Sequence, residues 1–149
     1  MFPRLAWVMI FATLLFNPVI AEASQSGTSD EAKAMLEKAV EAVKADKQEA
    51  LGLFNKGEGG FKDRDLYVFC ADASTGVETA HPAQEGFKLQ DIKDSNDFAF
   101  GQKIMDTAKE GQISEITYMW PKPGSEQPIE KTTYYTKADG QICGVGYYK

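Results

Sequence analysis

The chain has 149 residues and a formal net charge of -6, with 22 acidic and 16 basic residues. An acidic protein repels DNA, RNA and anionic lipid, so we expect no nucleic-acid partner. A chain of this length predicts one domain with one hydrophobic core.

The N-terminus has the three parts of a secretory signal peptide. Arg4 gives a positive start, an apolar run follows, and Ala21 and Ala23 put small residues where a signal peptidase cleaves. An uncleaved anchor is the alternative, although the apolar run is short for a bilayer span, which needs about 20 residues. We expect a signal peptide over residues 1–23, a single domain over residues 24–149 and no membrane span in the mature chain. The protein would then be periplasmic or secreted.

Two cysteines, Cys70 and Cys143, lie in apolar, strand-like sequence. In an oxidising compartment an even pair favours a disulfide, and two buried thiols that never meet are the alternative. The sequence has neither a CxxC nor a CxxCH motif. It therefore lacks the chemistry of a thioredoxin-type redox site and of a covalently attached c-type haem, and we expect no cofactor.

A long amphipathic helix is predicted to begin after Thr28. Thr28 followed by Glu31 fits a capping box, in which each residue's side chain satisfies a backbone N–H group at the start of a helix. Apolar residues then recur at helical spacing as far as about Phe54, and the glycines that begin at Gly57 end the helix.

Five strands and a second helix follow in the sequence. The strands are expected over residues 66–71, 77–81, 113–120, 129–137 and 141–148, with the helix over about residues 97–109. Connections of hairpin length, including an Asp139-Gly140 turn, indicate an antiparallel sheet, and the long helix is needed to cover one of its faces. The predicted fold class is therefore α+β.

Short motifs along these strands occur in a characteristic order. They include FKDRDLYVF at 61–69, AHP at 80–82, WP at 120–121, KTTY at 131–134 and GVGYY at 144–148. In this order they resemble the single Cache domain, type 2, of bacterial sensor proteins, over nearly all of the mature chain. The resemblance implies a PAS-like fold, in which a long N-terminal helix packs on a five-stranded antiparallel sheet with a helical crossover.

The resemblance also implies a location and a function. In the fold of this family the first and last strands are neighbours, so the resemblance places Cys70 next to Cys143. Such domains usually lie outside the membrane on chemoreceptors and histidine kinases, and several bind small carboxylates. Because the chain stops at Lys149, after the last strand, we expect the domain to act through a partner, either a membrane sensor or another periplasmic protein.

A site for a small anion needs a positive partner and oriented donors away from bulk water. Lys131, in the fourth predicted strand, would bind the anion. His81, the only histidine, stands at a strand end. Aromatic side chains would form the walls and supply hydroxyl or indole donors. The candidate ligand-binding residues are Tyr67, His81, Tyr118, Trp120, Lys131 and Tyr134.

Each candidate also has a structural interpretation. Lys131 would face water on an outer strand, His81 would be a hydrogen-bonded structural histidine, and the aromatic residues would belong to the core. Arg64 could reach an anion or form a surface ion pair. Strand alternation adds a conflict, because Lys131 and Tyr134 lie on opposite faces and share a pocket only where a bulge or twist intervenes.

Metal binding and catalysis have little support in the sequence. One histidine and no clustered cysteines give too few ligands for zinc, and Asp91, Asp94 and Asp97 lack the glycine and distal glutamate of an EF-hand. No Ser-His-Asp spacing or phosphate loop is present. We expect no metal site and no enzyme. The leading hypothesis is a sensor of a small organic ligand, most simply a carboxylate, and the alternative is a structural or interaction module with the same fold.

Overall fold

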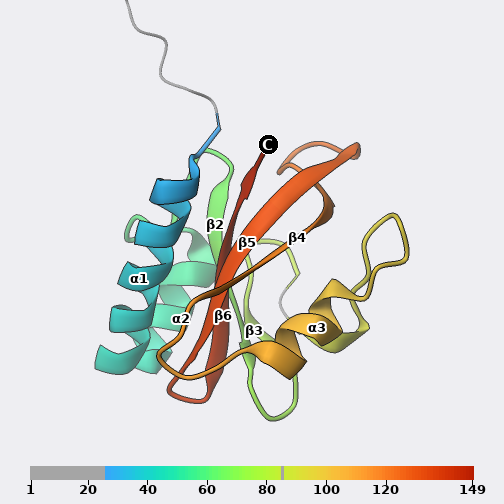
Figure 1. Ribbon diagram of the computed structural model, residues 1–149. Coiled ribbons are helices and arrows are strands. Elements are labelled where there is room, and N and C mark those ends of the chain that lie inside the picture. The colour runs from blue at the N-terminus through green and yellow to red at the C-terminus, as the bar shows by residue number, and fades with distance from the viewer. Residues whose placement is uncertain (1–25, 85) are drawn as a thin grey trace, which may run out of the picture.

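In the structure, a computed structural model that describes residues 26–84 and 86–149, helices cover both faces of an antiparallel sheet (Figure 1). The described helices are α1 (Ser29–Ala45), α2 (Lys47–Lys56), α3 (Phe100–Thr107) and a short 3-10 helix, η1 (Leu89–Asp91). The strands are β1 (Lys62–Asp63), β2 (Leu66–Asp72), β3 (Glu78–Ala80), β4 (Ser114–Pro121), β5 (Pro128–Ala138) and β6 (Gln141–Tyr148). The predicted α+β class is confirmed. The predicted signal peptide, residues 1–23, lies outside the described residues.

The predicted long N-terminal helix is divided into α1 and α2 at Asp46. The capping box at its start is present, because Thr28 and Glu31 each accept a backbone N–H group from the other. Asp46 is extended, with φ of -152°, and its side chain accepts the N–H of Glu49. Prediction of one continuous helix was wrong here, since an aspartate followed three residues later by a glutamate is itself a helix-start signal.

The sheet has the order β1-β2-β6-β5-β4, and β3 pairs with β2 further along the same edge as β1, opposite β6. The five predicted strands correspond to β2 to β6, and β1 is an additional two-residue strand. The neighbouring strands β2 and β6 are antiparallel, and their register places Cys70 opposite Cys143. These two cysteines form a disulfide, as the resemblance implied.

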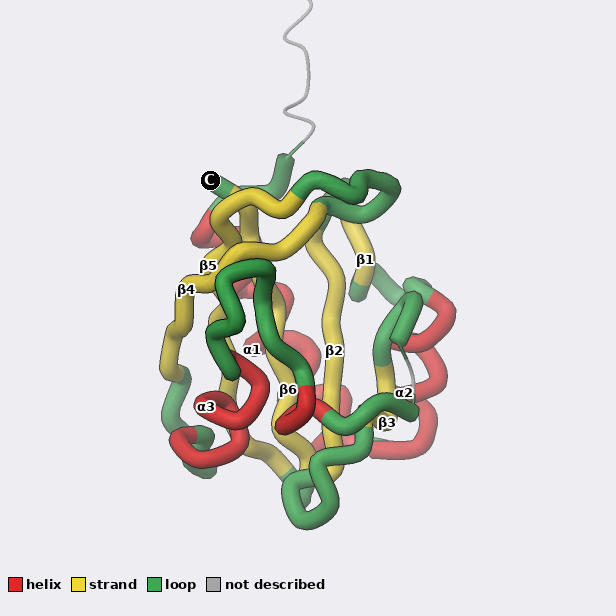
Figure 2. Tube along the Cα trace, turned by 90° about the vertical axis from the view of Figure 1, so that its right-hand side faces the viewer, coloured by secondary structure: helices red, strands yellow, loops and turns green. Residues whose placement is uncertain are grey.

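Alternation along the strands divides the core into two layers. Helices α1 and α2 pack on the first face, against side chains that include Leu66, Val68, Cys70, Cys143 and Val145. The second face packs against α3 and η1, and its side chains include Phe69, Tyr118, Tyr135 and Ile142. Figure 2 shows α3, η1 and the loops beside them in front of this second face. These two layers decide which side chains can share a site.

The loop before α3 is fixed to β4 by Asp94. Its Oδ1 accepts the backbone N–H groups of Asn96 and Phe98, and its Oδ2 accepts that of Met119 at 3.0 Å. One of the three aspartates considered as a calcium ligand is therefore a structural acceptor. None of the helices within residues 26–84 and 86–149 is long and apolar enough to cross a bilayer.

Candidate ligand-binding site

An inner cavity lies between the second face of the sheet and the elements that cover it. Its volume is about 20 Å³. Five of the six predicted ligand-binding residues line it, together with Glu78, Gln84 and apolar side chains. The full lining is Tyr67, Phe69, Glu78, His81, Gln84, Leu89, Ile92, Phe100, Tyr118, Trp120 and Lys131.

An outer cleft of about 290 Å³ lies next to the inner cavity. The two spaces share Tyr67, His81, Gln84 and Trp120 in their walls. The rest of the cleft is bordered by Lys62, by residues 82–83, and by residues 121–124 at the end of β4 and in the loop that follows it. The inner cavity therefore lies beside a wider cleft, and the four shared side chains form the boundary between the two spaces.

Lys131 is the positive group of the inner cavity. The residue is only 1% exposed, and its Nζ donates to the Tyr67 hydroxyl at 2.8 Å. The same ammonium lies 4.2 Å from the ring centroid of Tyr67 and 5.0 Å from that of Tyr148. None of the ion pairs among residues 26–84 and 86–149 includes Lys131. An ammonium has three N–H donors, so two remain for a ligand.

His81 is held in a fixed orientation and tautomer. Its Nδ1 accepts the backbone N–H groups of Ala83 and Gln84, at 2.9 and 3.0 Å. The proton of the neutral ring is therefore on Nε2, which makes that atom a donor. Burial, and then the nearby charge of Lys131, lower the pKa of His81 to about 4. The ring is thus neutral at ordinary pH and adds a second donor to the cavity wall.

The aromatic wall is a packed group of rings. Tyr118 stacks on Phe100 with 3.7 Å between ring centroids, and Trp120 meets Phe100 edge-on at 5.4 Å. The Tyr118 hydroxyl lies 2.9 Å from Oγ1 of Thr133. Burial raises the pKa of Tyr118 well above its usual range, so this hydroxyl keeps its proton. Tyr118 and Trp120 are therefore both core residues and cavity walls.

Glu78 is a cavity residue that the sequence analysis did not select. It is 3% exposed on β3, and its Oε2 has no hydrogen-bond partner among the described residues. Burial raises the pKa of its carboxyl to about 7. The available signal was a carboxyl within the predicted strand 77–81, which ends at His81.

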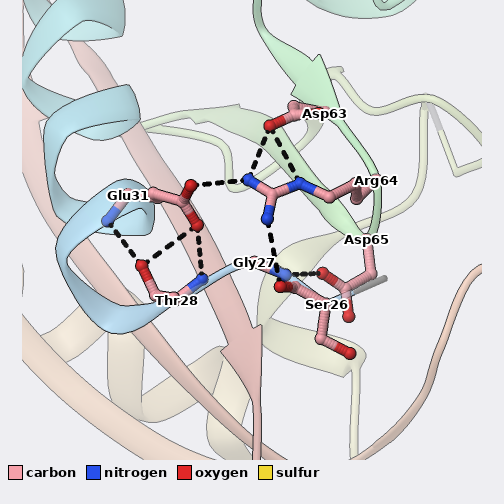
Figure 3. A network of polar contacts seen from close by, with 7 residues as sticks. All are labelled: Ser26, Gly27, Thr28, Glu31, Asp63, Arg64 and Asp65. Atoms are coloured by element: carbon pink, nitrogen blue, oxygen red, sulfur yellow. Dashed lines mark hydrogen bonds and ion pairs between the residues drawn. The ribbon is translucent and has the colours of Figure 1, made fainter. Parts of the chain in front are cut away.

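The structure does not bring Tyr134 to the cavity. Its hydroxyl lies 2.8 Å from Ser29 Oγ, and its ring lies 6.0 Å from that of Tyr147 on the first face. Strand β5 pairs with both of its neighbours without a bulge, so alternation keeps the side chains of Tyr134 and Lys131 on opposite faces of the sheet. Arg64 is also engaged elsewhere, with Glu31 and Asp63 each 2.7 Å from its Nη2 (Figure 3).

Sequence comparison finds a chemotaxis receptor among the relatives. The chain is 33% identical over 91 residues to the methyl-accepting chemotaxis protein McpP of Pseudomonas putida. The aligned segment is 58% of this chain and 16% of the receptor, so the chain spans only a small part of that protein's length.

Solved structures of sensor domains have the same fold. A methyl-accepting chemotaxis protein from Vibrio parahaemolyticus matches with a TM-score of 0.64 and 27% identity, over 80% of this chain and 86% of that one. A Cache chemosensory domain, described in terms of carboxylic acid recognition, matches with a TM-score of 0.62 over 80% of this chain and 92% of that one. Its identity of 24% shows the fold alone.

Residues 13–147 match the family described as Single Cache domain 2. The match includes β1 to β5, β6 as far as Tyr147, and every residue that lines the inner cavity. With the same fold in chemoreceptor sensor domains, it assigns this chain to the Single Cache domain 2 family.

Proposed function

We propose that this chain is an extracytoplasmic sensor domain that binds a short organic carboxylate, with Lys131 as the anion-binding residue. The observation that carries the proposal is a buried ammonium without a carboxylate partner among the described residues. Burial of a charge is costly unless a counter-charge and hydrogen bonds compensate for it. A ligand carboxylate supplies both.

Neighbouring donors support the same ligand class. A carboxylate at Lys131 would also lie near the Tyr67 hydroxyl and Nε2–H of His81, which line the same cavity. Charge-assisted hydrogen bonds of this kind are the stronger ones in proteins. Recognition of carboxylic acids by a structurally similar Cache domain, and chemotaxis receptors among the relatives, support the assignment by similarity.

Ligand entry requires the cavity to widen. About 20 Å³ suits one water molecule, which needs roughly 10–15 Å³. Gln84 and Trp120 are half-buried and belong to both the inner cavity and the outer cleft. We therefore expect the ligand to move these two side chains and the loop that carries Gln84.

Lys122 provides a path from the cleft to the start of α1. It lines the outer cleft, and its Nζ lies 2.6 Å from Ser26 Oγ and 3.3 Å from Asp65 Oδ2. Widening of the cleft would change these contacts. We propose that occupancy reaches a membrane receptor or another periplasmic protein through this end, and that residues 1–23 direct export as a signal peptide or an anchor.

Isothermal titration calorimetry of the purified protein with acetate, propionate, pyruvate and lactate tests the proposal. We expect one or more acids to bind, and Lys131→Met to remove the binding. Lys103→Met is the matched control, because Lys103 is an exposed lysine on α3. Failure of every acid to bind, or equal affinity in Lys131→Met, would overturn the proposal.

The small inner volume favours one other function, an interaction module with a filled cavity. In that case Lys131 and Tyr67 stabilise the fold, and a partner binds equally well with and without small acids. Binding of a captured periplasmic partner, measured with and without ligand, separates the two functions.

A further inference from the structure

The wall of the inner cavity contains an acidic residue, Glu78, as well as the basic Lys131. Both residues are almost completely buried. Oε2 of Glu78 has no hydrogen-bond partner among the described residues. Since nearly all buried polar atoms in native proteins are paired, an unpaired carboxyl oxygen of a residue that lines a cavity is a candidate ligand contact.

The two groups do not satisfy each other. No ion pair among residues 26–84 and 86–149 includes Glu78, and Lys131 is directed to the rings of Tyr67 and Tyr148 instead. Glu78 influences Tyr118, because its charge contributes to the raised pKa of that hydroxyl, after burial and Tyr67. The cavity wall therefore carries an ammonium and a carboxyl that do not form an ion pair with each other.

Apolar side chains form the rest of the wall. They are Phe69, Leu89, Ile92 and Phe100. A ligand that satisfies this lining has a carboxylate at one end, a short carbon chain and a hydrogen-bond donor away from the carboxylate. A simple monocarboxylate would instead place an alkyl group against Oε2 of Glu78, and that oxygen would stay unpaired.

We propose that the site selects short carboxylic acids that carry a hydroxyl or ammonium donor, with Glu78 as the specificity-determining acceptor. The inference rests on the proposed function, since Lys131 binds the carboxylate of the same ligand. A pKa of about 7 lets Glu78 accept from a hydroxyl, and an ammonium would favour its ionised form. The inner cavity has room for about one water molecule in the empty site.

A matched ligand series tests the inference by calorimetry. The acids are propionate, lactate, 3-hydroxypropionate, alanine and β-alanine, which share a three-carbon chain and differ in the donor and its position. We expect at least one donor-bearing acid to bind more tightly than propionate by about tenfold or more. The position of the best donor then reports the separation between Glu78 and the bound carboxylate.

Two substitutions of Glu78 complete the test. Glu78→Leu should remove the preference for donor-bearing acids over propionate. It should also strengthen propionate binding, because the unpaired oxygen is gone. Glu78→Gln keeps an acceptor oxygen, so it should retain hydroxy acids and weaken ammonium-bearing acids. Far-ultraviolet circular dichroism checks that both variants are folded.

The outcomes separate this inference from the proposed function. Equal affinities for propionate and the donor-bearing acids, or an unchanged preference in Glu78→Leu, overturn the role of Glu78. If Lys131→Met still abolishes binding in that case, the carboxylate site stands without it. If no acid binds the wild-type protein, both proposals fail.

Discussion

Lys131 on β5 lies over Gly146 on β6, and a Cβ atom at Gly146 would overlap Cε of Lys131. Strand β6 separates β5 from β2, so Lys131 must cross β6 to reach Tyr67. The missing side chain at Gly146 leaves that path open. The position of the buried ammonium therefore depends on a glycine of the neighbouring strand.

The first prediction follows from this contact. Gly146→Ala should displace Lys131 and lower affinity for the bound acid by about tenfold or more. Gly52→Ala is the control, because a Cβ atom there meets nothing within 4 Å. We expect unchanged affinity in the control, with a gain in helix stability of up to about 1 kcal/mol. Calorimetry measures the affinities, and unchanged binding in Gly146→Ala would contradict the dependence on Gly146.

The second prediction is that replacing Lys131 has opposite effects on the stability of the fold and on ligand binding. Lys131→Met replaces a buried charge with an apolar side chain of similar length, at the cost of one hydrogen bond to Tyr67. In the ligand-free protein we expect unchanged stability or a gain of about 1–2 kcal/mol, with loss of binding. Urea denaturation measures the free energy of unfolding. A large loss of stability would show that Lys131 has a structural role.

Strand patterns predicted the fold and most of the candidate site. Alternation identified the conflict between Lys131 and Tyr134, and the regular pairing of β5 shows that the conflict was real. The sequence could not show whether Lys131 or Tyr134 points into the cavity, because helices cover both sides of the sheet. That choice depends on pairing between β5 and β6, which places Gly146 beneath Lys131.

Glu78 and Asp46 show what strand and helix patterns miss. Glu78 is held by a loop that follows β3, because its backbone N–H donates to the Phe87 carbonyl at 2.7 Å. No local pattern reports such a contact. At Asp46 the apolar periodicity continues on both sides of the break, so helical spacing alone misses it, and the capping signal formed by Asp46 and Glu49 marks it instead.

The third prediction concerns the pH dependence of stability. Burial raises the pKa of Glu78 from its ordinary 4.5 to about 7, so the folded state holds this proton more tightly than the unfolded state. The stabilising effect of the protonated carboxyl is complete below the lower pKa and is lost as pH rises through the higher one. Between about pH 5 and about pH 8, Glu78→Gln should gain roughly 3 kcal/mol relative to wild type.

Urea denaturation at several pH values measures this difference. The contribution of His81, whose lowered pKa acts in the opposite direction, is common to both proteins and cancels. Glu126→Gln is the matched control, since Glu126 lies in an exposed turn. A constant difference between Glu78→Gln and wild type across this pH range would show that the carboxyl is not buried in solution.

The fourth prediction concerns the disulfide between Cys70 and Cys143, which are 73 residues apart in sequence. The chain-entropy model gives such a loop a stabilisation of about 4 kcal/mol. Replacement of both cysteines by alanine should lower the free energy of unfolding by roughly 2–5 kcal/mol. Reductant should lower the stability of wild type and leave the double variant unchanged. Equal wild-type stability with and without reductant would contradict the prediction.

The fifth prediction tests how the start of α1 is held. Figure 3 shows Asp65 beside Gly27, and Oδ1 of Asp65 accepts the Gly27 N–H at 2.6 Å. Its Oδ2 lies 3.3 Å from Nζ of Lys122, and the residue is 6% exposed. Asp65→Ala should cost about 1–3 kcal/mol, because it leaves a buried N–H group unpaired.

Two further variants separate the hydrogen bond from the charge. Asp65→Asn keeps an acceptor for Gly27 and loses the attraction to Lys122, so it should cost less than Asp65→Ala. Asp63→Ala removes an exposed partner of Arg64 and should change stability by no more than about 1 kcal/mol. Hydrogen exchange in the first turn of α1 should increase in Asp65→Ala alone. Equal exchange in all three variants would show that this contact does not hold the helix start, and the proposed path from Lys122 to α1 would lose its physical basis.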